Sequence, residues 1–189
     1  MQQTELVKLT RLWRHYLAND HSSLGWPVGH NQITLTSSPA NHRPVAQLPI
    51  SFQATPFNIR VKDSTFFAAS ALACLSLPAL FGETAQITTI CPTYGLEIKI
   101  TVTQDGITTS DPMDCVLSVM VPGKRPGSVY DSIIRSMDLA NHLMRFFSSA
   151  AAASVWLVAY PGVTILAMDD AWQLAMALFF YEEIGEGGE

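Results

Sequence analysis

An uninterrupted alternation of apolar and polar residues over positions 96–103 constrains the fold of this chain more than any other feature. The apolar positions are Leu96, Ile98, Ile100 and Val102, and the polar positions between them are Glu97, Lys99, Thr101 and Thr103. Because successive side chains of a strand point to opposite faces, the pattern predicts a half-buried strand of an antiparallel sheet. Residues 86–91 and 114–121 predict further strands of a meander, with turns at 92–95 and 105–106.

Residues 121–147 predict the end of a buried strand, then a loop, then a long helix. Ser128 and Asp131 have the spacing of a capping box at the start of that helix. Apolar residues follow at helical spacing, which predicts that one broad face packs on the domain. They are Ile133, Ile134, Met137, Ala140, Leu143, Met144 and Phe147.

Other segments carry clear helix or strand patterns. An amphipathic helix is predicted over 4–18, a strand over 57–61 and a helix from Asp63 or Ser64 to about Leu75, ended by Pro78. Residues 154–159 and 163–168 predict two strands of a hairpin around Pro161 and Gly162. Asp169 and Asp170 then open a last helix, where acidic residues favour the N-terminal dipole.

These elements together predict an α+β fold, with helices packed on one face of a mostly antiparallel sheet. A chain of 189 residues suits one domain, and a domain of this size buries roughly 70% of the surface of its unfolded chain. We expect a single domain over 1–184, with a long irregular segment at 19–49 and a disordered acidic tail at 185–189.

Charge and cysteine content exclude several classes of protein. The formal net charge of -5 argues against a nucleic-acid binder. The three cysteines, Cys74, Cys91 and Cys115, form no CxxC motif and lie in apolar surroundings. They predict buried, reduced thiols in a cytoplasmic protein, and the first residues contain no apolar signal-peptide core. Two charge-free runs, 64–82 and 146–168, are interrupted by Ser, Thr and Pro, so we predict no membrane span.

The loop at 123–128 is the best candidate for binding a small anion. Its residues are Gly123, Lys124, Arg125, Pro126, Gly127 and Ser128. It lies between a predicted buried strand and a helix N-terminus, where free N–H groups and the helix dipole attract negative charge. The GxxxxGK[ST] spacing of a P-loop is absent. An exposed strand-to-helix turn that is kept soluble by its cations is the favoured alternative.

No set of residues predicts a catalytic or metal site. His21, His30 and His42 match no regular metal-ligand spacing, so we predict no metal and no cofactor. His142 would serve as a base for Cys115 or Cys91 only if the fold brought them together. Neither GxSxG nor HExxH occurs in the chain.

The C-terminal helix is apolar nearly all round and therefore needs more than one neighbour to cover it. Its candidate partner-binding residues are Trp172, Met176, Phe179, Phe180 and Tyr181, with Trp13 as a helper. The sequence therefore favours a small, non-catalytic protein-binding domain of the adaptor, chaperone or inhibitor type, whose partner is another protein chain or a second copy of itself. The alternative is an enzyme or sensor that holds a phosphorylated or carboxylated small molecule at 123–128. A weaker alternative is attachment to a membrane surface through 4–18.

Overall fold

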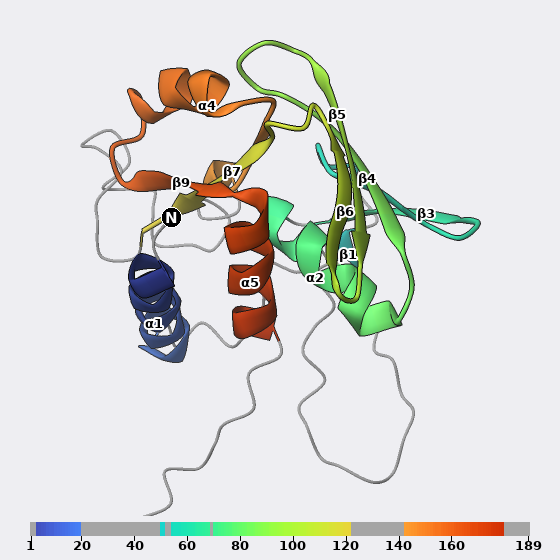
Figure 1. Ribbon diagram of the computed structural model, residues 1–189, viewed down its shortest axis with the longest axis horizontal. Helices are drawn as coiled ribbons and strands as arrows, with labels where there is room; N and C mark the ends of the chain where they lie inside the picture. Colours follow the sequence, from blue (N-terminus) through green and yellow to red (C-terminus); the bar gives the residue numbers. More distant parts are fainter. Residues whose placement is uncertain (1–2, 20–49, 52–53, 69, 122–141, 180–189) are drawn as a thin grey trace, which may run out of the picture.

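The structure is a computed structural model that describes residues 3–19, 50–51, 54–68, 70–121 and 142–179. It has an α+β architecture in which every strand pairing is antiparallel, as predicted. The strands form two sheets, and helices pack between and beside them (Figure 1). The irregular segment was predicted over 19–49; Asn19 is the last residue of helix α1, and the rest of the segment lies outside the described residues. The predicted anion-binding loop at 123–128 and the acidic tail at 185–189 also lie outside them.

The larger sheet has six strands in the order β1-β3-β2-β4-β5-β6. They are β1 (Ile50–Ser51), β2 (Asn58–Val61), β3 (Ser64–Ala68), β4 (Ala85–Ile90), β5 (Glu97–Thr103) and β6 (Gly106–Asp111). Strand β5 confirms the alternation from residue 97 on: Ile98, Ile100 and Val102 are buried, whereas Glu97 and Lys99 are exposed. Leu96, predicted on the buried face, precedes the strand and is exposed. The turn at 105–106 is also confirmed, and it leads into β6, a strand that the sequence did not predict.

The smaller sheet has three strands, β7 (Val116–Met120), β8 (Phe146–Phe147) and β9 (Val163–Ala167), in the order β8-β7-β9. Strand β7 is the apolar run that was predicted to continue the meander. It belongs instead to this second sheet, where Val116 pairs with Phe147 on one side and with Ala167 on the other. Burial on both faces explains why its sequence is almost continuously apolar.

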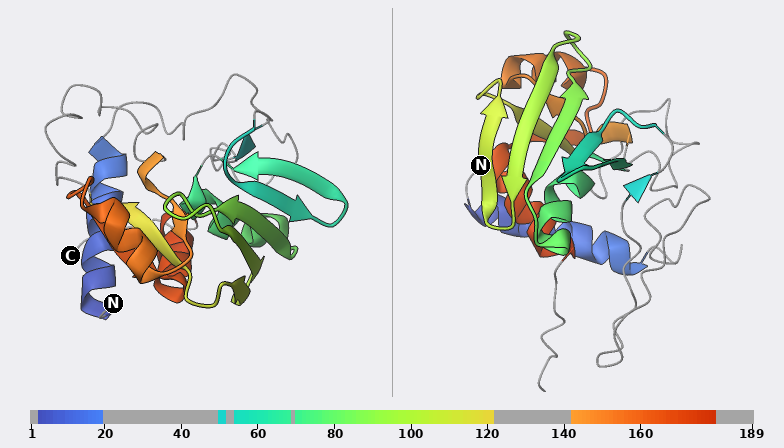
Figure 2. Two further views of the ribbon diagram at one scale, coloured as in Figure 1. Left: turned by 90° about the horizontal axis from the view of Figure 1, so that it is seen from above. Right: turned by 90° about the vertical axis from the view of Figure 1, so that its right-hand side faces the viewer.

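Four helices are described: α1 (Gln3–Asn19), α2 (Ala71–Phe81), α4 (Ala150–Leu157) and α5 (Met168–Phe179). Helices α2 and α5 lie side by side in the middle of the molecule, and α1 packs on α5 (Figures 1 and 2). The predicted opening of the last helix at Asp169 and Asp170 is confirmed by their place in the first turn of α5.

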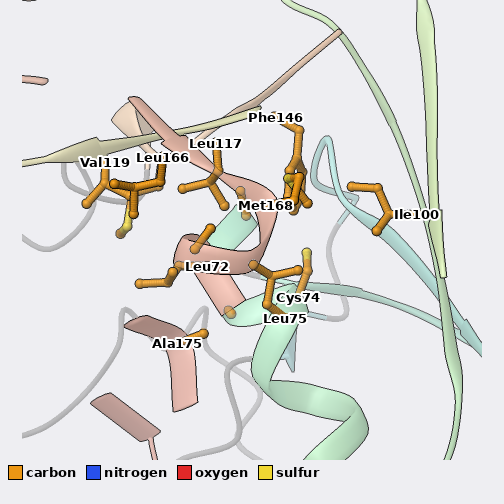
Figure 3. Packing of buried hydrophobic residues seen from close by; sticks show 14 of the residues in the cluster. Leu72, Cys74, Leu75, Ile100, Leu117, Val119, Phe146, Leu166, Met168 and Ala175 are labelled. Atoms are coloured by element: carbon orange, nitrogen blue, oxygen red, sulfur yellow. The ribbon is translucent and has the colours of Figure 1, made fainter. Parts of the chain in front are cut away.

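Helix α2 is the centre of the hydrophobic core. All residues from Ala71 to Pro78 are buried, so this part of the helix is enclosed on every side. Leu72 and Leu75 point into a cluster that also contains Leu117, Phe146 and Leu166 from the smaller sheet (Figure 3). Ile100 of the larger sheet is part of the same cluster. The two sheets and α5 therefore share one core around α2.

The predicted helix from Asp63 to Leu75 was wrong in its first half. A two-residue turn, Lys62 and Asp63, joins β2 to β3, and the flanking residues Val61 and Ser64 pair with each other. Lys62 has a φ of 51° in this turn. The β-branched and aromatic side chains after Ser64 favour a strand. The helix begins only after Ser70, whose Oγ accepts a hydrogen bond from the backbone N–H of Ala73 at 3.1 Å. Pro78 does not stop this helix, which continues to Phe81.

Two further predictions near the C-terminal half were also wrong. The predicted strand over 154–159 is mostly helix α4, because a run of alanines with high helix propensity follows Ser149, which caps it. Phe146 and Phe147, predicted as the end of the long helix, form strand β8 instead. No helix in the described ranges is both long enough and apolar enough to cross a membrane.

Replacing Trp13 with Phe tests whether α1 is an integral part of this domain. Trp13 is fully buried, and its indole N–H donates to the carbonyl oxygen of Met120 at 3.0 Å. Trp13→Phe should lower the free energy of unfolding by about 1–3 kcal/mol, since it leaves a buried carbonyl without this donor. Urea denaturation measures the change. Val7→Ala, at an exposed position of the same helix, is the control, and equal effects of the two variants would contradict the assignment.

Candidate functional site

The residues predicted to bind a partner lie on α5 or beyond it. Trp172 and Met176 are half-buried and pack against the core, and Phe179 is the last residue of α5. Phe180 and Tyr181 lie outside the described residues. Part of the apolar surface of α5 is thus covered by its own domain, through the buried residues Ala171, Leu174 and Ala175. The partner-binding role of this helix stays a prediction.

The three thiols have different environments, which separates them as candidates for chemistry. Cys74 lies in α2, is fully buried, and its Sγ donates to the carbonyl oxygen of Ser70 at 3.2 Å. Burial raises the pKa of Cys74 well above its ordinary value. Since the thiolate is the reactive form of cysteine, Cys74 is an inert core thiol.

Cys91 is the thiol best prepared to act as a nucleophile or a metal ligand. It directly follows β4, and the hydroxyl of Ser148 donates to its Sγ at 3.5 Å. Burial alone would raise the pKa of Cys91. Hydrogen bonds from the Ser148 side chain and from the backbone N–H groups of Ser148, Tyr94 and Thr93 outweigh that effect, so the pKa lies below the ordinary value of 9.0. The site therefore stabilises a thiolate with neutral donors.

Cys115 immediately precedes β7 of the smaller sheet. Val116 at the start of β7 pairs with Phe147, so continuing the antiparallel register by one residue places Cys115 opposite Ser148. Burial, the charge of Asp111 and an electrostatic interaction with Cys91 raise the pKa of Cys115 to about 11. We call Cys91, Cys115 and Ser148 the thiol site. It combines a thiol whose pKa is lowered with a thiol whose pKa is raised.

Other predicted catalytic and metal residues do not join this site. The ring of His142 lies 6.4 Å from that of Trp156, and no hydrogen bond links His142 to Cys91 or Cys115 in the described part of the chain. Burial and the neighbouring Arg145 lower the pKa of His142. His21, His30 and His42 lie outside the described residues, among which no group of three His, Cys, Asp or Glu side chains gathers.

A second buried polar cluster surrounds Ser118, and its groups are occupied by structural hydrogen bonds. The Ser118 hydroxyl donates to the carbonyl oxygen of Leu143 at 2.7 Å and accepts from the N–H of Arg145 at 3.1 Å. The guanidinium of Arg145 lies over the ring of Phe57, 5.4 Å from its centroid. These contacts fix the chain before β8, and they leave no nucleophile free for chemistry.

Comparison with known proteins identifies the family of this chain. The model of the family described as MerB, alkylmercury lyase, matches residues 50–180. The chain belongs to the alkylmercury lyase family. The match begins at β1 and runs through α5, so it includes both sheets and all three residues of the thiol site.

Individual relatives agree with this assignment. An alkylmercury lyase of Staphylococcus epidermidis is 33% identical over 132 residues, which cover 69% of this chain and 57% of that protein. One from Streptomyces lividans is 29% identical, covering 66% of this chain and 54% of that protein. One from Bacillus cereus is 31% identical over 157 residues, which cover 81% of this chain and 68% of that protein. The chain thus spans little more than half the length of the first two relatives.

A solved structure described as the mercury-bound form of MerB2 has the same fold. Its TM-score with this chain is 0.54 at 21% sequence identity, over 72% of this chain and 66% of that chain. The likeness supports the α+β architecture with two antiparallel sheets.

The prediction of a non-catalytic protein-binding domain was therefore wrong, since curated members of the family are lyases. It rested on the absence of short catalytic motifs. The thiol site has no such motif, because Cys91, Cys115 and Ser148 come from separate parts of the chain. Sequence reasoning named both cysteines but missed Ser148, which adjoins the charge-free run of α4 and carries no spacing relation to either.

Differential alkylation tests the assignment of the two protonation states. The thiolate fraction of Cys91 should rise with pH at a midpoint below 9.0, whereas Cys115 should ionise only near pH 11. Mass spectrometry after brief iodoacetamide pulses at pH 6 to 10 would measure both residues in one sample. Cys74 serves as the internal control and should stay unmodified in the folded protein. Modification of Cys115 at lower pH than Cys91 would contradict the assignment.

Proposed function

We propose that this chain cleaves the carbon–mercury bond of small organomercury compounds, with Cys91 and Cys115 as the mercury ligands. The observation that carries the proposal is the hydrogen bond from Ser148 to Cys91, together with the strand register that places Cys115 opposite the same serine, in a chain of the alkylmercury lyase family. The substrate class comes from the names of the relatives. The two residues come from the geometry of the thiol site.

The first step is capture of the organomercury cation by Cys91. Mercury is a soft metal, and soft metals select thiolate over oxygen and nitrogen ligands. Cys91 presents its sulfur as a thiolate more readily than the other two cysteines do, because Ser148 and nearby N–H groups donate to it. The product of this step is a neutral adduct in which mercury bonds both the organic group and the sulfur of Cys91.

The second step uses the proton that Cys115 retains. The Cys115 sulfur bonds mercury, and its proton passes to the carbon as the carbon–mercury bond breaks. The electron pair of that bond forms the new carbon–hydrogen bond. A hydrocarbon leaves, and mercury(II) stays bound to the two sulfurs without change of oxidation state. The raised pKa of Cys115 keeps this proton in place until mercury binds the sulfur.

The proposed reaction also leads to expectations for the binding partner and the cellular location of the chain. A small molecule is the expected substrate, and the described structure gives no reason to require a protein partner for the reaction. We also propose a cytoplasmic location, because the three cysteines are free and no disulfide stabilises the domain. The predicted homodimer stays a prediction.

Hydrocarbon release from methylmercury and phenylmercury tests the proposal. In deuterated water the wild-type chain should release methane or benzene carrying one deuterium, measured by gas chromatography with mass spectrometry. Cys91→Ser should abolish release because mercury is no longer captured. Cys115→Ser should still bind the mercurial but lower the rate of release by about 10²–10⁴-fold, the usual contribution of a positioned proton donor.

Cys74→Ser is the matched control. It changes a third buried cysteine while keeping a hydroxyl that can donate to the Ser70 carbonyl, as the thiol does. Its rate should stay within a few-fold of wild type. Release of hydrocarbon by Cys91→Ser at the wild-type rate would refute the assigned residues. Absence of release by the wild-type chain in the presence of a thiol reductant would refute the proposed activity itself.

A further inference from the structure

Arg145 is a half-buried arginine whose guanidinium pairs with no carboxylate in the described part of the chain. It directly precedes β8, and its guanidinium lies over the ring of Phe57, 5.4 Å from the ring centroid. Burial lowers the pKa of Arg145, and no carboxylate among the described residues counteracts this effect. The positive charge is therefore partly removed from water without an anionic partner from these parts of the chain.

Such an arrangement costs stability unless another group compensates the charge. Taking a guanidinium out of water is unfavourable, and contact with the face of an aromatic ring offsets only part of that cost. Replacing a buried charged group with an apolar side chain of similar volume is often neutral or stabilising. A half-buried arginine without a carboxylate beside it is thus better explained by an anion that binds from outside than by packing alone.

The base of the Arg145 side chain is held in place by β7. The N–H of Ser118 donates to the carbonyl oxygen of Arg145 at 2.9 Å, and the N–H of Arg145 donates to the Ser118 hydroxyl at 3.1 Å. The ring under the guanidinium is also fixed, because Phe57 is only 2% exposed and packs edge-on against Phe146 at 6.1 Å. Binding an anion here would therefore require little additional ordering of the chain.

The charge around Arg145 indicates the class of anion. His142 interacts with Arg145 electrostatically, and burial together with that interaction lowers the pKa of His142 from its ordinary value of 6.5. Its imidazole is therefore neutral at pH 7.5, and the guanidinium is the one charge of this pair. A single positive charge matches a monoanion better than a phosphate dianion. The planar fork of a guanidinium also matches the two oxygens of a carboxylate.

We propose that Arg145 binds the carboxylate group of a small organic monoanion. The face of the guanidinium stays on the ring of Phe57, and N–H groups at its edge donate to the two carboxylate oxygens. The site requires neither a thiol nor mercury. It is therefore an addition to the proposed cleavage of carbon–mercury bonds and does not rest on it.

Titration with benzoate at pH 7.5 tests the proposal. The Nε–H signal of Arg145 in the proton–nitrogen NMR spectrum should shift and saturate, and its absence from Arg145→Met assigns it. Benzyl alcohol, which has the same ring without the charge, should leave the signal unchanged. By calorimetry, Arg145→Met should bind benzoate about 10–100-fold more weakly, as expected for the loss of a charge-assisted hydrogen bond. Arg60→Met, which removes an exposed arginine from β2, is the matched control and should bind as the wild type does.

Urea denaturation separates a binding role of Arg145 from a packing role. Methionine keeps an unbranched apolar stem over Phe57 but carries no charge. Without benzoate, Arg145→Met should therefore be as stable as the wild type or more stable. Benzoate should raise the urea midpoint of the wild type and of Arg60→Met, but not that of Arg145→Met. A benzoate-free Arg145→Met that is less stable than the wild type would show that the arginine is retained for packing, and would overturn the proposal.

Three further results would overturn it. They are the absence of a saturable shift with benzoate, equal weakening of binding in Arg60→Met and Arg145→Met, and tighter binding of inorganic phosphate than of benzoate. None of these measurements involves mercury or a cysteine. Failure of the carboxylate site is thus distinguishable from failure of the proposed lyase activity.

Discussion

Enclosure of α2 is the constraint on which the rest of the structure depends. Its buried half carries apolar or small side chains in every direction, so no single neighbour can cover it. The larger sheet, the smaller sheet and α5 each bury part of its surface in one continuous cluster. The N-terminus of α2 is also joined to the chain just before β8, because the N–H of Ala71 donates to the carbonyl oxygen of Met144.

Closing two sheets around one helix brings the end of β4 next to the ends of β7 and β8. Ser148 donates to the thiol of Cys91, and the register of β7 with β8 places Cys115 opposite Ser148. Cys91 follows a strand of the larger sheet, Cys115 precedes a strand of the smaller sheet, and the chain after β8 contributes the hydroxyl. The thiol site is therefore a consequence of core packing, and a change that shifted one sheet against the other would separate the two sulfurs.

The two thiols differ because their surroundings differ, although both are almost completely buried. Hydrogen-bond donors surround Cys91 and favour its anion. Burial, the acidic side chain of Asp111 and the negative charge of Cys91 itself disfavour the anion of Cys115. The two thiols thus have pKa values shifted in opposite directions although they belong to the same residue type. Such a pair offers the mercury ligand and the proton donor that the proposed cleavage requires.

Some of this organisation could be predicted from sequence. The alternation of apolar and polar residues over 96–103 predicted β5, and the apolar run before Val121 predicted the buried strand β7. Both patterns reflect directly which side chains are buried. The hairpin at Lys62 was missed, since Asp63 and Ser64 also resemble a helix cap. Helix α4 was missed because its C-terminal valines resemble a strand. The thiol site was not predictable, because its geometry depends on the register of β7 with β8 and on the contact of two sheets, which no local spacing encodes.

X-ray absorption at the mercury edge, after reaction of the chain with one equivalent of methylmercury, tests the central claim most directly. The account predicts mercury bonded to two sulfur atoms and no carbon in the wild-type chain and in Cys74→Ser. It predicts one sulfur and the carbon in Cys115→Ser, and no captured mercury in Cys91→Ser. Mercury still bonded to carbon in the wild-type chain, or a two-sulfur site that survives replacement of Cys91, would contradict it.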